Sequence, residues 1–475
     1  MDSQSVIWQC AALLVLVGLR SIWVVIYRLF FHPLAKVPGP IFARATFLYA
    51  TWYNLLGARF ISTLSCPIVR ITPNEIHLSD PENCEKIYFV GSRYGKDPGF
   101  YGAFDTKNLT FSTPSPAIHR IKRAVLNPFF SRKKVLELEE IVQDKVQKLV
   151  ARMKRAFGST SSIDLHHGFR AISIDIITDY AFDDCYNFLD KGDFGVGFFN
   201  DFREMGPALW FFQQFPELQR IAMGIPHWLA KCISEPLRRK CSRLQILQVK
   251  AVVDRGEKAS KINIFHQLLQ PDVTEGFRDE AQIVLGAAAD TTGNALTISA
   301  YKVVRNTDIY SRLSAELKDA FPNPEATLDF VTLERLPYLA VVRWTGRLPR
   351  VIPASGAEFN GYRVSPGTVV SMSSWIMHHD EGIFPDAETF NPDRWLHESQ
   401  ARVGERYLFS SGKGSRQCVG MQLAYCELYV TLGHVFRQFD NLKTAAKSRE
   451  ELLYDDYFSG YHPEKNNKFV FRQAE

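Results

Sequence analysis

The sequence lacks the short motifs by which several common enzyme classes are recognised. It contains no Gly-x-Gly-x-x-Gly after a predicted strand, no phosphate-loop Gly-Lys-Ser/Thr, no His-Glu-x-x-His and no Gly-x-Ser-x-Gly. The usual signatures of dinucleotide binding, nucleotide hydrolysis, zinc peptidases and serine hydrolases are therefore missing. There is also no internal repeat or low-complexity tract, which argues against a repeat architecture.

Cysteine and net charge are both scarce. The eight cysteines form no Cys-x-x-Cys pair, which argues against a disulfide scaffold or a zinc ribbon, and we expect reduced thiols. The formal net charge is +5, too small for a dedicated nucleic-acid-binding protein. With 46% hydrophobic and 23% charged residues, the chain is globular with a large core, and neither disordered nor a multi-span membrane protein.

One long apolar run stands near the N-terminus. Val6 to Tyr27 carry a single charge, Arg20, and a helix of this length can cross the hydrocarbon layer at ~1.5 Å per residue. Basic residues follow the run, which places the rest of the chain in the cytosol. A signal peptide or a buried core helix is the alternative, because Gln9 and Arg20 weaken the hydropathy. We expect residues 1–30 to be a membrane anchor and the Pro-rich residues 31–40 a stiff connector.

Helical periodicity dominates the remaining chain. Residues 134–157 and 279–304 have the pattern of long helices, whereas Pro73-Asn74 and Asn360-Gly361 lie between short alternating runs that indicate hairpins. No linker after the connector separates two cores. We therefore predict a mainly α fold with small β-sheets, as a single domain over residues 41–475.

The most informative stretch is a glycine-rich loop that brings Cys418 to the start of an apolar-periodic helix. Backbone N–H groups at the helix start, together with Arg416, should lower the pKa of the thiol. The sulfur could then be a nucleophile with a histidine brought near by folding, or a single soft axial ligand to haem iron. A purely structural cysteine is the third alternative.

A second candidate site lies within the predicted helix over residues 279–304. Four small residues, 286–289, precede Asp290 and Thr291. Ala287 and Thr291 are one turn apart, so the hydroxyl would lie beside a part of the helix surface with little side-chain volume. A small ligand such as oxygen could be protonated there. Close helix packing is one alternative, and a hydroxyl bonded to the carbonyl four residues earlier is another.

The order and spacing of these two sites resemble the cytochrome P450 haem-thiolate monooxygenases over nearly the whole chain. The resemblance implies the cytochrome P450 fold, with haem b as the cofactor and Cys418 as the proximal ligand to its iron. It also implies that Gly414, Arg416 and Gly420 shape the cysteine loop.

The same resemblance implies roles for residues elsewhere in the chain. Asp290 and Thr291 would form the acid–alcohol pair that serves oxygen activation. His119 and Arg123 lie in a segment similar to the family's helix facing the haem propionates, with His119 where many members carry Trp. Arg347, in Gly-Arg-Leu-Pro-Arg-Val-Ile-Pro, resembles the later propionate-binding arginine.

The sequence departs from the family after Leu336. The family's Glu-x-x-Arg helix is expected there, but residues 335–356 contain no acidic residue. Arg394, which resembles the arginine that pairs with this motif, would lose its partner, and an uncompensated buried charge costs about 3–5 kcal/mol. The alternative function is therefore a non-catalytic or misfolded family member that binds haem poorly.

The amino-acid sequences of the Pro-rich connector and of the cysteine loop most resemble those of fungal family members that act in secondary metabolism, in the branch that includes trichodiene oxygenase. The implied protein is a single-pass endoplasmic reticulum membrane protein with a cytosolic catalytic domain. It would oxidise an apolar small molecule, such as a terpenoid, with O2 and electrons from an NADPH-dependent cytochrome reductase. A basic face for this donor, or an ordinary solvated face, is expected from Lys122, Arg123, Arg132, Lys133, Lys134 and Lys413.

Overall fold

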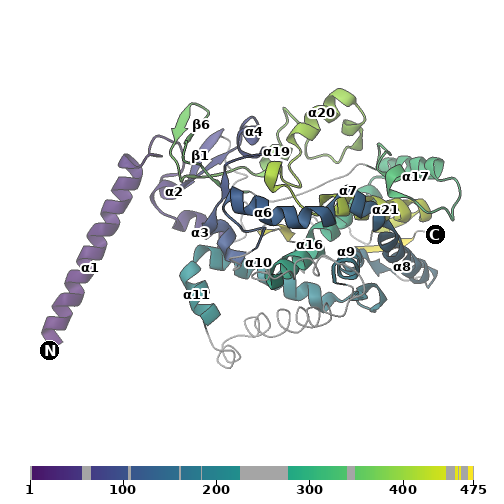
Figure 1. The fold of residues 1–475 in the computed structure, drawn as a ribbon, viewed down its shortest axis with the longest axis horizontal. Helices are drawn as coiled ribbons and strands as arrows, with labels where there is room; N and C mark the ends of the chain where they lie inside the picture. The colour runs from purple at the N-terminus through teal and green to yellow at the C-terminus, as the bar shows by residue number, and fades with distance from the viewer. Residues whose placement is uncertain are drawn as a thin grey trace.

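The fold is mainly helical, with four small sheets in the part of the chain that the structure describes (Figure 1). The structure is a computed structural model. It describes residues 3–55, 66–104, 109–159, 162–182, 185–224, 277–339, 348–444, 455–457, 459–461 and 469–473.

The helices follow in two groups. The first group is α1 (Ser3–Ile26), η1 (Tyr27–Phe31), α2 (Ile41–Ala45), α3 (Leu48–Leu55), α4 (Asn83–Ile87), α5 (Pro98–Tyr101), η3 (Gly102–Phe104), α6 (Pro116–Leu126), η4 (Asn127–Phe130), α7 (Arg132–Glu137), α8 (Glu139–Gly158), α9 (Leu165–Phe182), η5 (Phe188–Asp190), α10 (Val196–Gln214) and α11 (Pro216–Gly224). The second group is α16 (Phe277–Val304), α17 (Thr307–Ala320), α18 (Phe330–Leu333), α19 (Ser374–His378), η6 (Pro392–Trp395), α20 (Glu398–Tyr407), η7 (Gly414–Arg416) and α21 (Met421–Gln438).

The largest sheet has the strand order β1-β2-β8-β5-β3, from β1 (Ile68–Thr72), β2 (Glu75–Leu78), β3 (Gly95–Lys96), β5 (Arg350–Val351) and β8 (Val369–Ser371). A second sheet is ordered β4-β12-β9, from β4 (Ile163–Asp164), β9 (Leu442–Thr444) and β12 (Val470–Gln473). Two hairpins complete the set, β6 (Ala357–Phe359) with β7 (Tyr362–Val364) and β10 (Asp455–Tyr457) with β11 (Ser459–Tyr461). Both predicted hairpins are confirmed, and Asn360 and Gly361 have the positive φ angles that a two-residue turn requires.

The helical core forms around α16, which packs against both α9 and α21. The helix predicted over residues 279–304 is thus confirmed as α16. The helix predicted over 134–157 is two helices, α7 and α8, which meet at Leu138. The Ser131 hydroxyl caps α7 by accepting the Lys134 N–H, and α8 then begins a new amphipathic face that buries Val142, Val146 and Leu149.

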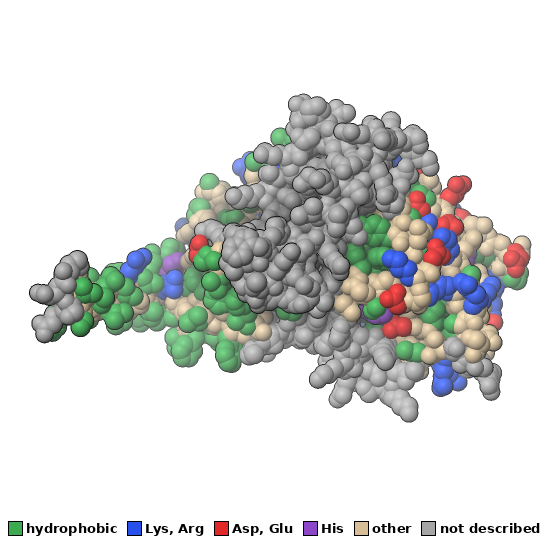
Figure 2. Space-filling view, turned by 90° about the horizontal axis from the view of Figure 1, so that it is seen from below, with side chains coloured by type: hydrophobic (Ala, Val, Ile, Leu, Met, Phe, Trp, Pro, Cys, Tyr) green, Lys and Arg blue, Asp and Glu red, His purple; other side chains and the backbone are tan. Residues whose placement is uncertain are grey.

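The apolar N-terminal run is a helix that projects from the body. Val6–Phe31 is long and apolar enough to cross a membrane, and its most apolar stretch is not buried against the body (Figure 1). Figure 2 shows hydrophobic side chains covering this helix and continuing onto the adjoining surface. The helix is therefore a candidate membrane anchor.

Candidate functional site

Cys418 lies in the short loop that enters α21. Its backbone N–H donates to the carbonyl of Ser411 (2.9 Å) and closes the loop. Gly412 and Gly414 have φ angles of 67° and 68°, in the left-handed region that favours glycine. At Gly414 a Cβ atom would lie 2.4 Å from the Phe89 carbonyl oxygen. Backbone conformation and close approach thus both require glycine at position 414.

Gly420, the other glycine expected to shape this loop, has an ordinary backbone. Its φ angle is −83°, and it is the N-cap residue of α21. The nearest neighbour of an added Cβ would be Phe130, at 4.0 Å. The protein part of the site therefore gives no steric reason for glycine at position 420.

A buried histidine that the sequence analysis did not assign orients the segment before the loop. His378, in α19, accepts a hydrogen bond from the Phe409 backbone N–H at Nε2 (3.0 Å). Burial lowers the pKa of His378 to about 4, so the imidazole is neutral and can accept. This hydrogen bond gives His378 a structural role beside the cysteine loop.

Two predicted arginines fasten the cysteine loop to neighbouring segments. Arg123 of α6 donates to the carbonyl of Gln417, directly before the cysteine (2.7 Å). Arg416 donates to the carbonyls of Thr113 (2.7 Å) and Pro114 (3.0 Å). Two guanidinium groups, one from α6 and one from the loop itself, therefore connect the loop to its neighbours.

Two cations that sequence reasoning missed lie with His119 near these arginines. Lys96 of β3 and Arg350 of β5 are 6% and 3% exposed and oppose each other in the sheet. Lys96 donates to the Phe111 carbonyl (2.6 Å), and Arg350 donates to the Tyr101 hydroxyl (3.1 Å). Burial and the surrounding cations lower the pKa of His119 to about 3 and that of Lys96 well below its usual value.

Arg350 and Lys96 differ in whether the sequence contained a local motif that could point to them. Arg350 stands three residues after Arg347, in the segment expected to supply a propionate-binding arginine. Only the position of Arg350 in strand β5 shows that it reaches the site. Arg347 itself lies outside the described residues. Lys96 belongs to no motif, and only the pairing of β3 with β5 brings it to the site.

The cationic group, which we define as Lys96, Arg123, Arg350 and Arg416, needs an anionic partner, and the neutral His119 lies beside it. Within the described residues no carboxylate forms a salt bridge with any member. Burial and like charge lower the pKa of Lys96 and of Arg416. A thiolate at Cys418 would oppose the effect of burial on Arg123. The two propionates of a haem fit this group, because charge-assisted hydrogen bonds from buried cations satisfy carboxylates.

The predicted acid–alcohol pair lies in α16. The Thr291 hydroxyl donates to the carbonyl of Ala287 (2.8 Å), which is the backbone-bonded alternative considered for this residue. Asp290 forms a salt bridge with Arg170 of α9; the two side chains are 26% and 3% exposed. A Cβ at Gly293 would lie 2.5 Å from Cγ of Arg170, so the two helices are in close contact here.

Arg394, the residue expected to suffer from the missing Glu-x-x-Arg motif, is held by backbone carbonyls. It donates to Pro385 (3.1 Å), Asp386 (3.1 Å) and Thr389 (3.3 Å). Its side chain is partly exposed. The penalty for a buried, unpaired charge therefore does not apply to it. Residues 340–347, where the motif would fall, lie outside the described part.

A hollow of about 890 Å³ borders the cysteine loop and the start of α21. Arg132 and Lys413, two members of the expected basic face, line it, but so do Glu85, Glu334 and Glu405. Arg132 forms a salt bridge with Glu334. Lys134, also expected on the basic face, pairs with Glu137 (3.0 Å). The charge on this side is therefore mixed rather than uniformly basic.

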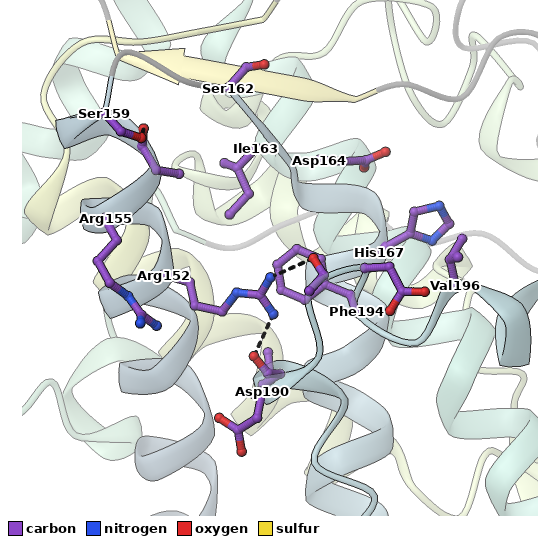
Figure 3. A pocket seen from close by; sticks show the side chains of 14 residues that line it. Arg152, Arg155, Ser159, Ser162, Ile163, Asp164, His167, Asp190, Phe194 and Val196 are labelled. Carbon is purple, nitrogen blue, oxygen red and sulfur yellow. Dashed lines mark hydrogen bonds between the residues drawn. The ribbon is translucent and has the colours of Figure 1, made fainter.

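A second hollow, of about 830 Å³, lies between α8 and the segment that leads into α10 (Figure 3). Arg152 lies over the Phe194 ring (3.7 Å from its centroid) and donates to the carbonyls of Leu189 and Lys191 (2.6 Å each). None of the site residues expected from the sequence lines this hollow. We do not assign it to the reaction site.

Comparisons with known proteins show the family of the chain. The family model described as Cytochrome P450 matches residues 72–469. The chain is similar to cytochrome P450 monooxygenase MO6277 of Ascocoryne sarcoides, with 34% identity over 91% of this chain and 92% of the relative. It is similar to the monooxygenase tpcC of Cochliobolus heterostrophus, with 32% identity over 90% and 87%. It is also similar to aflU of Aspergillus parasiticus, with 31% identity over 93% and 92%. The expected resemblance to fungal monooxygenases is confirmed, and the chain belongs to the cytochrome P450 family.

Proposed function

We propose that the protein is a membrane-anchored haem-thiolate monooxygenase that oxidises an apolar small molecule. The family supports a monooxygenase whose haem iron is bound by a cysteine thiolate. The observation that carries the assignment to this site is the cationic group beside the Cys418 loop, which has no carboxylate partner in the described chain.

Within this proposal Cys418 is the axial ligand, and Arg123, Arg350 and Arg416 bind the propionates. Lys96 lies among these arginines, whereas His119, whose pKa is lowered to about 3, is neutral and adds no charge. Arg347 remains a proposed contact that the described residues do not include. When bound, haem supplies the iron chemistry of oxygen activation. The chain supplies the thiolate, the propionate contacts and the groups of α16.

The role proposed for α16 is proton delivery. Asp290 is partly exposed and precedes Thr291, whose hydroxyl is fixed by its bond to the Ala287 carbonyl. A hydroxyl that donates its own proton to a carbonyl can still accept a hydrogen bond, and can pass on a proton that it receives. The salt bridge with Arg170 fixes the position of the Asp290 carboxyl next to Thr291 in the chain.

An apolar substrate is supported by an aromatic cluster close to the cationic group. Phe100, Tyr101 and Trp210 are buried together, with Phe104 and Phe111 packed against them. Tyr101 accepts the hydrogen bond from Arg350, which connects this cluster to the proposed propionate site. A fungal secondary metabolite such as a terpenoid is the substrate class that we propose.

Attachment to the endoplasmic reticulum membrane is supported by α1 and by the apolar surface next to it. Large apolar side chains on α2 and α3 are exposed, including Ile41, Phe42, Leu48 and Trp52. An exposed apolar surface beside a candidate span is suited to lie against the bilayer. We propose that the catalytic domain, residues 41–475, lies on the cytosolic side and receives electrons from an NADPH-dependent reductase.

The absorption spectrum of the reduced, carbon-monoxide-treated protein tests the proposal. Wild type and Cys66→Ser should show the red-shifted band of thiolate-bound iron, because Cys66 is an exposed cysteine that precedes β1 and is not one of the site residues. Cys418→Ser should lose that band. A haem spectrum without the shift in wild type would contradict the assignment of Cys418. A failure to take up haem would favour the alternative, a non-catalytic member, which the missing Glu-x-x-Arg motif suggests.

A further inference from the structure

Three arginines meet where the N-terminal helix joins the body. Arg28 belongs to η1 at the end of the apolar run, Arg44 to α2, and Arg70 to β1. Figure 2 shows basic and histidine side chains at this junction, between the apolar helix and the body. We call the three residues the junction arginines.

Backbone carbonyl groups hold all three side chains in place. Arg28 donates to Ala45 (2.9 Å), and Arg44 donates to Leu29 (3.2 Å) and Ala35 (2.7 Å). These bonds tie the end of the anchor to α2 and to the connector. The positions of the two guanidinium groups are therefore fixed before any ligand arrives.

Arg70 is buried and holds the backbone that carries Arg28 and the connector. It is fully buried and donates to the carbonyls of Arg28 (2.8 Å), Leu34 (3.3 Å) and Pro73 (2.8 Å). Burial, Arg44 and Arg28 lower the pKa of Arg70 to about 10, so it stays positive at neutral pH. It cannot reach a ligand and acts as a positioning residue.

The charge at the junction is not neutralised within the described chain. No salt bridge there involves a junction arginine, and the acceptors found for them are neutral carbonyls. The Nε atom of Arg44 is enclosed without an acceptor. Burial and the charges of Arg70 and Arg28 also lower the pKa of His32, which lies between them in the connector. The junction is thus a site of concentrated positive charge that lacks its counter-ion.

The surroundings indicate which anion would fit. Exposed apolar residues flank Arg44 on both sides along the chain, with Phe42 73% and Leu48 68% exposed. Arg28 stands at the end of the candidate span. Cations fixed at the end of a span and flanked by exposed apolar side chains lie at the depth of lipid headgroups.

We propose that Arg28 and Arg44 bind the phosphate of an anionic phospholipid. Planar guanidinium groups suit phosphate oxygens, and an uncompensated cationic site favours a headgroup without a positive amine over a zwitterionic one. The site would fix the angle between the anchor and the body, because both arginines already tie the anchor to α2. This inference rests on the membrane attachment proposed above.

The test uses the full-length protein reconstituted in dioleoyl phosphatidylcholine vesicles. Spin-labelled phosphatidic acid and spin-labelled phosphatidylcholine report the ratio of their association constants with the protein. We expect wild type to prefer the acidic lipid. Arg28→Gln and Arg44→Gln should each reduce that preference about fivefold, the factor expected for roughly 1 kcal/mol per basic residue at an anionic surface. Lys36→Gln removes one exposed charge from the same connector without removing a phosphate contact, and should reduce the preference less than either arginine variant.

Further measurements separate this inference from the other outcomes. Arg44→Lys keeps the charge and should retain part of the preference if the variant folds, which the haem spectrum reports. A wild-type protein that floats with the vesicles but shows equal association with both lipids overturns the lipid site and leaves the anchor intact. Loss of the preference on adding inorganic phosphate would assign the site to free phosphate and overturn the lipid as its ligand. A protein that does not float with the vesicles overturns both the anchor and the lipid site.

Discussion

Arg170 of α9 and Asp290 of α16 form a salt bridge one residue before Thr291. The guanidinium is almost fully buried, whereas the carboxylate keeps about a quarter of its surface, 26%, in contact with solvent. The pair therefore joins two core helices through one buried and one partly exposed side chain. Its two members should respond differently to mutation.

Removing the acid from this pair should be more harmful than removing the base. Asp290→Asn leaves Arg170 buried without its carboxylate, and we expect a loss of about 3–5 kcal/mol in unfolding free energy. Arg170→Met leaves a carboxylate that water can reach, so its loss should be smaller. The double variant should lose less than the sum of the two, as urea denaturation would show. Additive losses would mean that the salt bridge contributes no coupling energy.

Thr291 can be tested against a threonine that makes the same bond elsewhere in α16. Thr297 also donates to the carbonyl four residues earlier, that of Gly293 (2.7 Å), but it is fully buried. Thr291→Ala should raise the hydrogen peroxide released per NADPH consumed, because proton delivery to oxygen is lost. Thr297→Ala should change stability without changing this ratio. Equal peroxide release from both variants would indicate an effect of helix geometry and not of the proton relay.

The two loop glycines expected from the resemblance should behave differently. Gly414→Ala would place a methyl group against the Phe89 carbonyl at a positive φ, so we expect most of the bound haem to be lost. Gly420→Ala has an ordinary φ and no close neighbour in the protein, and should retain its haem. Haem content per protein, measured as the pyridine haemochrome, gives the comparison. Similar haem loss in both would show that contacts beyond the described chain constrain position 420.

A buried acid in α21 should make stability depend on pH. Glu427 accepts a hydrogen bond from the Ser173 hydroxyl (2.7 Å), and burial raises the pKa of Glu427 from 4.5 to about 8. Between these values the folded protein holds a proton that the unfolded chain has lost. The unfolding free energy should therefore fall as pH rises through this window, by about 1.4 kcal/mol per pH unit.

Glu427→Gln should remove this dependence. The amide cannot ionise, so the stability of the variant relative to wild type should increase from pH 5 toward pH 8. Urea denaturation at a series of pH values measures it. A difference between the two proteins that stays constant with pH would show that Glu427 titrates normally.

Local signals in the sequence predicted the main parts of the fold and of the site. The Asn360-Gly361 turn, the long helix α16 and the loop around Cys418 each depend on residues close together in the chain. The contacts that complete the site do not. Lys96 reaches the cationic group only because β3 pairs with β5, and Arg170 meets Asp290 only because α9 packs against α16. Neither residue belongs to a local pattern, so sequence periodicity and spacing had no means to find them.

Lys96 offers the sharpest test of the cationic group, because it should affect the empty and the haem-bound protein in opposite directions. Without haem, burial and then the charges of Arg350, Arg416 and Arg123 lower the pKa of the Lys96 ammonium. Lys96→Met keeps most of the side-chain volume and removes this repulsion, so the haem-free protein should become more stable. With haem, the same change removes part of the charge that attracts the propionates, and the haem should dissociate faster. Lys86→Met, on the exposed side of α4, removes an equal charge outside the group and should change neither property. Thermal unfolding of the haem-free protein and haem transfer to apomyoglobin measure the two effects. If Lys96→Met weakened both states alike, the lysine would be a packing residue, and the propionate assignment would then depend on the three arginines alone.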